Sequence, residues 1–183
     1  LRVAEKMDSG DIIAQDFVEI DPEENAGELG ERLALIGDNL LTKVVDGFEH
    51  SSVCFLPQRH ELATMAPKLK REDGLIKWAQ PAQKVHDFIR GMNPRPGAYT
   101  SLPPGKRLLI LRSRLADVGV EYFQPLPKPG AIIRLSEEGI LVAANPPEAY
   151  ALWITHLQPE GGKAMTAAEY LRGHPLHEGE VFN

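Results

Sequence analysis

Hydrophobic and polar residues alternate with a helical period between about residues 26 and 45. Asn25 is a preferred N-cap residue, Glu28 stands three positions later as in a capping box, and Gly47 is suited to end the helix. We therefore predict a helix whose apolar face packs in a core. That face is formed by Leu29, Leu33, Ile36, Leu40, Leu41 and Val44.

The segments on either side of this helix have no helical period. Residues 12–20 are rich in β-branched and other apolar residues, which predicts strand structure before a turn at Asp21-Pro22. Residues 49–70 show no sustained period and contain two prolines, so we interpret them as a linker. The one cysteine, Cys54, lies in this linker and excludes an internal disulfide.

A second amphipathic helix is predicted after residue 80, where Pro81 suits the first turn. An apolar anchor precedes it, formed by Leu75, Ile76 and Trp78. Four residues at helical spacing make a buried stripe: Val85, Phe88, Ile89 and Met92. The polar positions are expected to face outward, namely Lys84, Asp87 and Arg90, with His86 near the edge. Gly91 and Asn93-Pro94 are expected to end the helix, and a strand to begin near Ala98.

The remainder of the chain alternates between short apolar runs and turn residues. This pattern predicts strands at 107–111, 131–135, 140–144 and 149–157, with a longer loop at 115–128. Thr166 followed by Glu169 is a second capping box and predicts a last short helix. Short strands at this spacing favour a small β-rich barrel.

Charge divides the chain near residue 70. Residues 1–69 hold 6 Lys and Arg against 14 Asp and Glu, a net of −8, whereas residues 70–183 hold 14 against 12, a net of +2. This change supports a domain boundary, and a net of +2 is weak support for a nucleic-acid partner. No apolar run approaches the roughly 18 residues that a membrane span requires.

Two aspartates, Asp8 and Asp11, flank a Ser-Gly turn near the start of the chain. Carboxylates in such a loop provide either an acid/base site or a metal site. The alternative is a solvated turn, because Asp, Ser and Gly favour turns for conformational reasons. Spacing alone favours the solvated turn.

The sequence contains no phosphate-binding loop, no nucleophile elbow and no dinucleotide fingerprint. No histidine forms a metal-ligand pair with a cysteine, and we predict no metal site. Basic residues of the second half are candidates for phosphate contacts, although interspersed Glu137 and Glu138 leave ordinary surface charge as the alternative. These basic residues are Arg90, Arg95, Lys106, Arg107, Arg112, Arg114, Arg134 and Lys163.

Five motifs, in order along the chain, resemble the C-terminal part of the methionyl-tRNA formyltransferase family. The turn at 7–12 is similar to the family's Asp-x-Gly-Asp loop, and Lys68-Leu69 with Glu72-Asp73 is similar to the entry into its second domain. Ile76-Lys77-Trp78 resembles its Ile-Asp-Trp anchor. Two later segments complete the resemblance: the Pro-rich bend at 93–98, and residues 157–165, which read LQPEGGKAM.

The resemblance implies a fold of two parts. Residues 1–48 would be an α/β remnant of a Rossmann-like formyltransferase domain, residues 49–70 a linker, and residues 71–183 a β-rich open barrel resembling an OB-fold. It implies a monomeric, cytoplasmic or organellar-matrix enzyme that passes a formyl group from 10-formyltetrahydrofolate to initiator methionyl-tRNA.

The resemblance also implies site residues. Asp8 matches the family's catalytic aspartate, which would orient and support a basic histidine. The histidine, an asparagine and most of the folate pocket would lie upstream of Leu1, so we expect the chain alone to be an inactive C-terminal portion. The residues implied to bind tRNA are Arg90, Arg95, Lys106, Arg107 and Lys163.

Two departures from the family pattern are Arg95, where the bend usually has Trp, and Lys77, where the anchor usually has an acid. Both add positive charge to the second part. Two other functions stay open: a related folate enzyme, such as the hydrolase part of formyltetrahydrofolate dehydrogenase or a sugar-amine formyltransferase, and an RNA-binding barrel without catalysis.

Overall fold

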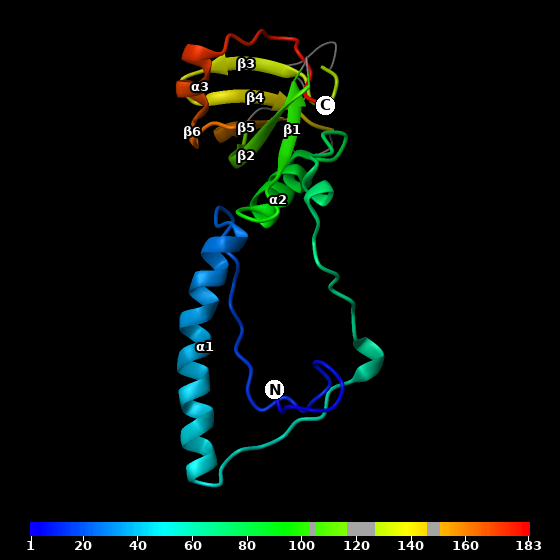
Figure 1. Cartoon of the computed structure of the whole chain (residues 1–183), viewed down its shortest axis with the longest axis vertical. Helices are drawn as coiled ribbons and strands as arrows, with labels where there is room; N and C mark the ends of the chain where they lie inside the picture. Colours follow the sequence, from blue (N-terminus) through cyan, green and yellow to red (C-terminus); the bar gives the residue numbers. More distant parts are fainter. Residues whose placement is uncertain (103–104, 117–126, 146–150) are drawn as a thin grey trace. The chain divides into compact units, whose positions relative to one another are not determined.

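The computed structural model describes residues 1–102, 105–116, 127–145 and 151–183, which form two compact units (Figure 1). The first unit comprises Leu1–Pro22 and Glu28–Lys68, and the second comprises Glu23–Gly27 and Leu69–Asn183. The first unit contains most of helix α1 (Ala26–Glu49) and the short 3₁₀ helix η1 (His60–Leu62). The second unit contains the sheet. Each unit is described by itself below.

Helix α1 confirms the predicted amphipathic helix but not its end or its burial. The Asn25 side chain accepts a hydrogen bond from the Gly27 N–H at 2.8 Å, as expected of an N-cap. The helix continues past Gly47 to Glu49, and none of its residues is buried. Leu33 and Leu41, both predicted core residues, are 46% and 62% exposed. The described residues provide no second apolar layer over this face, so its packing in a core stays a prediction.

The strand predicted within residues 12–20 is also absent from the described structure. Only Ile12 takes part in β-type pairing, as an isolated bridge to Leu56 with hydrogen bonds of 2.8 and 2.9 Å. A strand is stabilised by a partner strand along its length. In the described structure, Ile12 is the one residue of this segment that forms a β-type pair with another segment, so no ladder of hydrogen bonds forms despite the β-rich composition.

The second unit is built on an open antiparallel sheet. Its six strands are β1 (Tyr99–Leu102), β2 (Lys106–Leu115), β3 (Ile132–Ser136), β4 (Gly139–Ala143), β5 (Ala151–Pro159) and β6 (Met165–Thr166). The order is β1-β2-β5-β4-β3, with β6 paired to β5. The sheet is not closed by pairing between its edge strands β1 and β3 in the described residues. The predicted strands are therefore confirmed in place, with bounds shifted by up to four residues.

Two predictions fall partly outside the described residues. The predicted loop at 115–128 contains residues 117–126, and the predicted start of the fifth strand, at 149–150, is likewise outside. The part of that strand that is described begins at Ala151.

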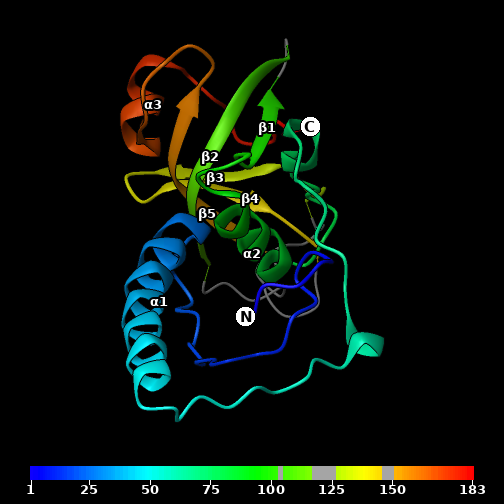
Figure 2. The ribbon, with the colours of Figure 1, turned by 60° about the horizontal axis from the view of Figure 1, so that its bottom comes forward.

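Helix α2 (Ala82–Met92) packs on β2 and β5 and buries one face of the sheet (Figure 2). Its buried residues are Ala82, Val85, His86 and Ile89, while Phe88 and Met92 are partly buried against the same core. The predicted stripe is thus confirmed at Val85 and Ile89. The prediction that His86 lies near the edge was wrong, because its side chain is only 4% exposed. Gly91 still lies in the helix, which ends at Met92, directly before Asn93-Pro94 as predicted.

Trp78 lies where three distant segments of the second unit meet. Its ring stacks on Phe182 with centroids 5.6 Å apart, and its Nε1–H donates to the Thr100 hydroxyl at 3.0 Å. The Thr100 hydroxyl in turn donates to the Asn183 carbonyl oxygen at 2.9 Å. Trp78 and Phe182 are 5% and 2% exposed. These four residues join the entry to α2, strand β1 and the C-terminal tail, with Asn183 exposed and the other three buried.

The C-terminal tail connects the two open edges of the sheet. The Phe182 N–H donates to the Gly130 carbonyl, and Val181 bridges Ala131, next to the start of β3. One residue on, Asn183 exchanges two backbone hydrogen bonds with Ser101 of β1. The tail therefore supplies hydrogen-bond partners at both edges, which would otherwise expose unpaired backbone groups.

Helix α3 (Ala167–Gly173) confirms the predicted second capping box. The Glu169 N–H donates to the Thr166 hydroxyl oxygen at 3.2 Å, and the Thr166 N–H donates to the Glu169 carboxylate at 2.8 Å. The Thr166 hydroxyl also donates to that carboxylate at 2.9 Å. Hydrogen bonds from the Thr166 backbone and side chain hold the pKa of Glu169 below its usual value of 4.5.

Replacing Phe182 should destabilise the sheet unit. We expect Phe182→Ala to lower the free energy of unfolding by about 3–5 kcal/mol, because it leaves a cavity beside Trp78. Urea unfolding followed by tryptophan emission measures this, since both tryptophans, Trp78 and Trp153, lie in this unit. The control is Phe17→Ala, whose side chain is 85% exposed and should change stability by less than about 0.5 kcal/mol. Equal effects of the two variants would contradict the role of Phe182.

The contribution of the Glu169 carboxylate to the stability of the fold should fall as the pH is lowered. Its carboxyl has a lowered pKa in the folded state, so its stabilisation is present above the unfolded value of 4.5 and is lost as the pH falls through the folded pKa. Wild type should melt at a higher temperature than Glu169→Gln at pH 7, and the difference should shrink as the pH falls below 4.5 and the carboxylate takes up a proton. A difference in Tm that is constant across this range would count against the hydrogen bonds to the carboxylate.

Candidate functional site

The Asp8 turn presents a carboxylate on the surface of the first unit. Asp8 has φ of 54°, in the left-handed region that Asp tolerates better than most residues. The Gln58 side-chain amide fixes the turn by donating to the Asp8 carbonyl at 2.8 Å and to the Gly10 carbonyl at 2.6 Å. Asp8 is exposed, and its carboxylate has no hydrogen bond within the described residues. The turn thus holds the backbone and leaves the acid available.

Asp11 is not brought together with Asp8 as a metal site. Its carboxylate lies 3.9 Å from the Arg2 guanidinium, at the limit of an ion pair. Among the described residues, no group of three or more His, Cys, Asp or Glu side chains is placed to hold a metal ion. Cys54 is exposed as a free thiol. The described residues therefore do not show a metal site at this turn, and an exposed carboxylate fits both an acid/base site and a solvated turn.

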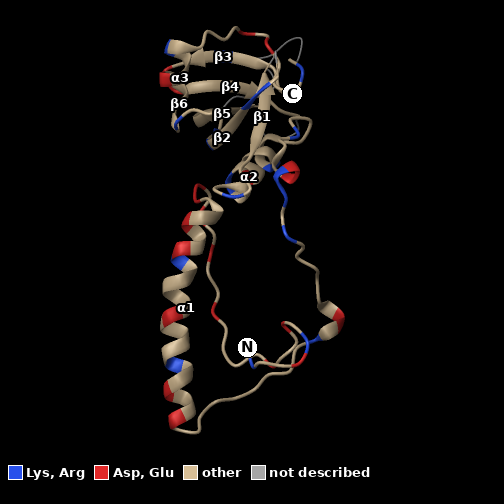
Figure 3. Cartoon of the chain, in the orientation of Figure 1, with Lys and Arg blue, Asp and Glu red and all other residues tan. Residues whose placement is uncertain are grey.

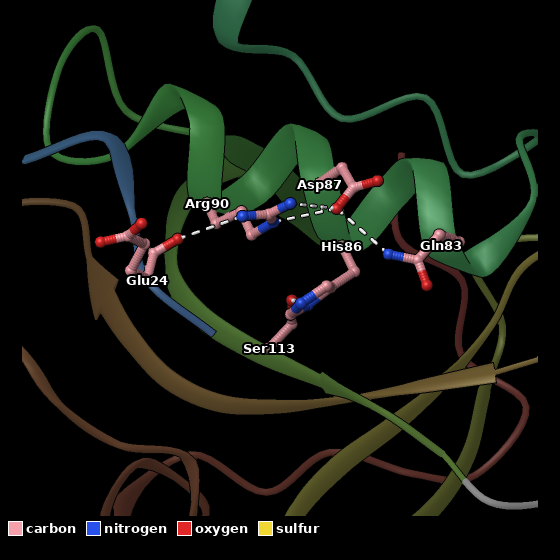
Figure 4. Close-up of polar contacts among 6 residues, drawn as sticks. All are labelled: Glu24, Gln83, His86, Asp87, Arg90 and Ser113. Atoms are coloured by element: carbon pink, nitrogen blue, oxygen red, sulfur yellow. Dashed lines mark hydrogen bonds and ion pairs between the residues drawn. The ribbon is translucent and has the colours of Figure 1, made fainter. Parts of the chain in front are cut away.

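A polar cluster beneath α2 ties this helix to the sheet (Figure 4). The His86 Nδ1 lies 3.0 Å from the Ser113 hydroxyl of β2, and both residues are buried. On the same helix, Arg90 pairs with the Asp87 carboxylate at 2.9 Å and donates to the Glu24 carbonyl at 3.4 Å. Gln83 donates to Asp87 at 3.1 Å. Arg90, predicted to bind tRNA, is thus held by groups of its own chain.

A second basic site lies on the face of β1 and β2 turned away from the core. Arg107 stands opposite Ser101 in the register, so it is diagonal to Tyr99, and its guanidinium stacks over the Tyr99 ring at 3.8 Å. Arg71, from the 3₁₀ helix η2 (Arg71–Gly74), lines the same pocket of about 240 Å³. Pro96, Leu109, Gln158, Pro159, Glu160 and Gly161 complete the lining.

The guanidinium of Arg107 is partly desolvated. Burial and the nearby Arg71 charge lower the pKa of Arg107, while Tyr99 and Glu160 act in the opposite direction. The Arg107 Nε atom is buried and has no hydrogen-bond partner. Neither Arg71 nor Arg107 forms an ion pair within the described residues. A stacked, partly dehydrated arginine beside a second arginine favours an anionic acceptor.

Three other predicted basic residues are adjacent in sequence to this pocket. Arg95 precedes Pro96, Lys106 precedes Arg107, and Lys163 lies two residues after Gly161, and all three are exposed. Sequence reasoning missed Arg71, which precedes the acidic residues Glu72 and Asp73. Figure 3 shows how Lys and Arg are distributed over the second unit and how acidic residues dominate α1.

The cleft along the outer side of α2 is larger and of mixed charge. It measures about 740 Å³ and is lined by Lys77 and Lys84 together with Glu72, Asp73 and Asp87. Leu75, predicted to be part of the apolar anchor, lies here and is 40% exposed, whereas Ile76 and Trp78 are buried as predicted. Two basic and three acidic side chains line this cleft, so it favours no ligand of one sign.

Comparison with known proteins assigns the second unit. The family described as formyl transferase, C-terminal domain, matches residues 68–175. The chain belongs to the formyltransferase family. Within the described residues, no helix is long and apolar enough to cross a membrane.

Relatives from bacteria match nearly the whole chain. The chain is 41% identical over 179 residues to a methionyl-tRNA formyltransferase of Moorella thermoacetica, covering 98% of this chain and 55% of that protein. It is 36% identical to the corresponding protein of Bacillus velezensis, covering 98% and 54%, and 39% identical to that of Solibacter usitatus, covering 98% and 54%. The chain thus spans about half the length of these formyltransferases.

Solved structures of HypX from Aquifex aeolicus share the fold. A variant of that protein superposes with a TM-score of 0.66 over 98% of this chain and 33% of HypX, at 19% identity. A second structure is HypX in complex with tetrahydrofolic acid, with a TM-score of 0.61 over 98% of this chain and 32% of HypX, also at 19% identity. At this identity the likeness establishes the fold alone.

Proposed function

We propose that this chain is part of a methionyl-tRNA formyltransferase, which transfers a formyl group from 10-formyltetrahydrofolate to the amino group of methionyl-tRNA in translation initiation. The observation that carries this proposal is the match over 98% of the chain to relatives of that name. The match spans the Asp8 turn and the C-terminal domain in one continuous chain, so it covers both parts of the proposed machinery.

The domain assignment follows from the same proposal. Residues 1–48 would belong to a Rossmann-like catalytic domain, 49–70 to the linker and 71–183 to a domain resembling an OB-fold. α1 is amphipathic, yet none of its residues is buried. A helix from a layered domain would look like this when the layer that covers its apolar face is not part of the chain. The six-stranded open sheet, with its tail at both edges, supports the third assignment.

Asp8 would act through a histidine rather than on substrate. An exposed carboxylate on a turn fixed by Gln58 can accept a hydrogen bond from one N–H of an imidazole. This bond would keep the other ring nitrogen unprotonated and able to act as a base. The histidine would accept the proton that the methionine amine loses when its nitrogen attacks the formyl carbon. 10-Formyltetrahydrofolate, when bound, would supply that electrophilic carbon. The bond from this carbon to the folate nitrogen would break, and tetrahydrofolate would leave after taking up the proton from the histidine. Asp8 is thus proposed as a positioning residue on the reaction side of the protein.

The basic pocket of the second unit supports an RNA partner. Arg71 and Arg107 offer two cations without ion-pair partners in the described chain, and exposed Arg95, Lys106 and Lys163 belong to the neighbouring segments. Lysine and arginine that neutralise phosphates account for most non-specific affinity for nucleic acid. A monomeric enzyme that holds tRNA on this unit is therefore the proposed arrangement.

A second candidate is another folate-dependent formyltransferase or hydrolase. It is favoured by the fold shared with HypX, one structure of which contains tetrahydrofolic acid. The two candidates differ in the acceptor: the amine of methionyl-tRNA, or a small amine or water. Product analysis with each acceptor therefore decides between them.

Asp8 gives the sharpest test of the proposed reaction. The chain is joined to the part of the Moorella thermoacetica relative that it does not match, and formylation of methionyl-tRNA is measured. We expect activity from this fusion, and a loss of about 100- to 10,000-fold in kcat for Asp8→Asn, because the amide cannot support a protonated imidazole. The control is Asp16→Asn, an exposed aspartate on the same unit, which should retain full activity.

Two results would contradict the proposal. One is formylation of a small amine, but not of methionyl-tRNA, by the active fusion. The other is equal activity of the Asp8→Asn and Asp16→Asn variants.

A further inference from the structure

The pocket that contains Arg71 and Arg107 is built by backbone contacts that leave little freedom. The Ile76 N–H donates to the Tyr99 carbonyl at 2.8 Å, which fixes the segment following η2 against β1. A side chain at Gly74 would collide with the Gly97 carbonyl oxygen, so glycine is required for this close approach. Arg71 begins the same 3₁₀ turn that Gly74 ends. The position of Arg71 relative to β1 is thus set by the fold.

Arg107 is also fixed before any ligand binds. Its guanidinium stacks over Tyr99 at 3.8 Å, and this contact restricts a side chain that is otherwise flexible. Its Nε–H lacks an acceptor, which leaves a buried donor unsatisfied. A cation that is already oriented and partly dehydrated binds an anion with a more favourable free energy than a fully hydrated surface cation does.

We propose that this pocket binds a phosphate group of the RNA backbone, with Arg71 and Arg107 as its ligands. This inference rests on the proposed function, which supplies an RNA substrate. Two guanidinium groups match the oxygen atoms of a phosphate, each able to donate two parallel hydrogen bonds. The lining carboxylate, Glu160, offsets part of this charge and leaves the pocket with a net positive charge.

The surroundings favour a chain of phosphates over a free anion. Each of three segments that line the pocket carries an exposed cation close by in sequence: Arg95 beside Pro96, Lys106 beside Arg107, and Lys163 after Gly161. A series of cations at the rim suits the repeated charges of a nucleic-acid backbone. A free phosphate would engage only the two arginines inside.

Salt dependence of RNA binding tests the proposal. The affinity of the 183-residue chain for methionyl-tRNA is measured over a range of salt concentrations. Arg71→Gln and Arg107→Gln should each weaken binding about tenfold or more at low salt, and each should reduce the slope of log K against log salt by about 1. Arg71 is exposed, so its variant also tests the pocket if Arg107→Gln fails to fold.

The matched control is Arg172→Gln. Arg172 is an exposed arginine on α3 that does not line the pocket. This variant removes the same charge from the same unit, so it should leave the slope within experimental error of wild type. Slopes for the Arg71 and Arg107 variants equal to that of Arg172→Gln would overturn the proposal.

The Nε–H resonance of Arg107 separates the possible sources of phosphate. We expect this resonance to shift on adding either inorganic phosphate or tRNA. A shift with inorganic phosphate but not with tRNA would overturn the RNA assignment, and no shift with either would overturn the site.

Failure of this inference is distinguishable from failure of the proposed function. Formylation by the fusion with unchanged salt slopes would reject the pocket alone. Reduced slopes without formylation would reject the reaction and leave the phosphate site supported.

Discussion

The fold of the second unit depends on one group of contacts, the stacking of Trp78 on Phe182 and the hydrogen bonds from Trp78 through Thr100 to Asn183. An open sheet has two edges, and both expose backbone donors and acceptors. The tail that carries Phe182 supplies partners at each edge, so its apolar anchor and its backbone pairing stabilise the same arrangement. Burying an indole also requires an acceptor for its N–H, which Thr100 provides.

Backbone contacts connect the Trp78 cluster to the basic pocket. Trp78 lies two residues after Ile76, whose N–H binds the Tyr99 carbonyl, and Tyr99 is the ring on which Arg107 stacks. η2, with Arg71, precedes Ile76 in the same segment. A binding surface held in this way loses little conformational entropy when a ligand binds. The unit thus combines a rigid frame with two cations whose charges are not paired within the described residues.

Short-range signals in the sequence predicted most of the local structure, and long-range contacts explain the failures. The capping box of Thr166 and Glu169 and the stripe of Val85 and Ile89 depend on neighbours within a few residues. The burial of His86 depends on Ser113, which is 27 residues away, and the tail pairs with strands far upstream. The strand predicted at 12–20 was wrong because composition does not supply a partner. Asp8 was proposed as a site residue through family resemblance, since spacing alone favoured a solvated turn.

We propose that the Asp8 turn serves the chemistry and that the Arg71 and Arg107 pocket binds RNA. Steady-state kinetics of the fusion protein, with methionyl-tRNA as the varied substrate, tests this division most directly. The account predicts that Arg107→Gln raises KM about tenfold or more with kcat nearly unchanged, as expected for a residue that contributes binding alone. A fall in kcat at unchanged KM for this variant would contradict it.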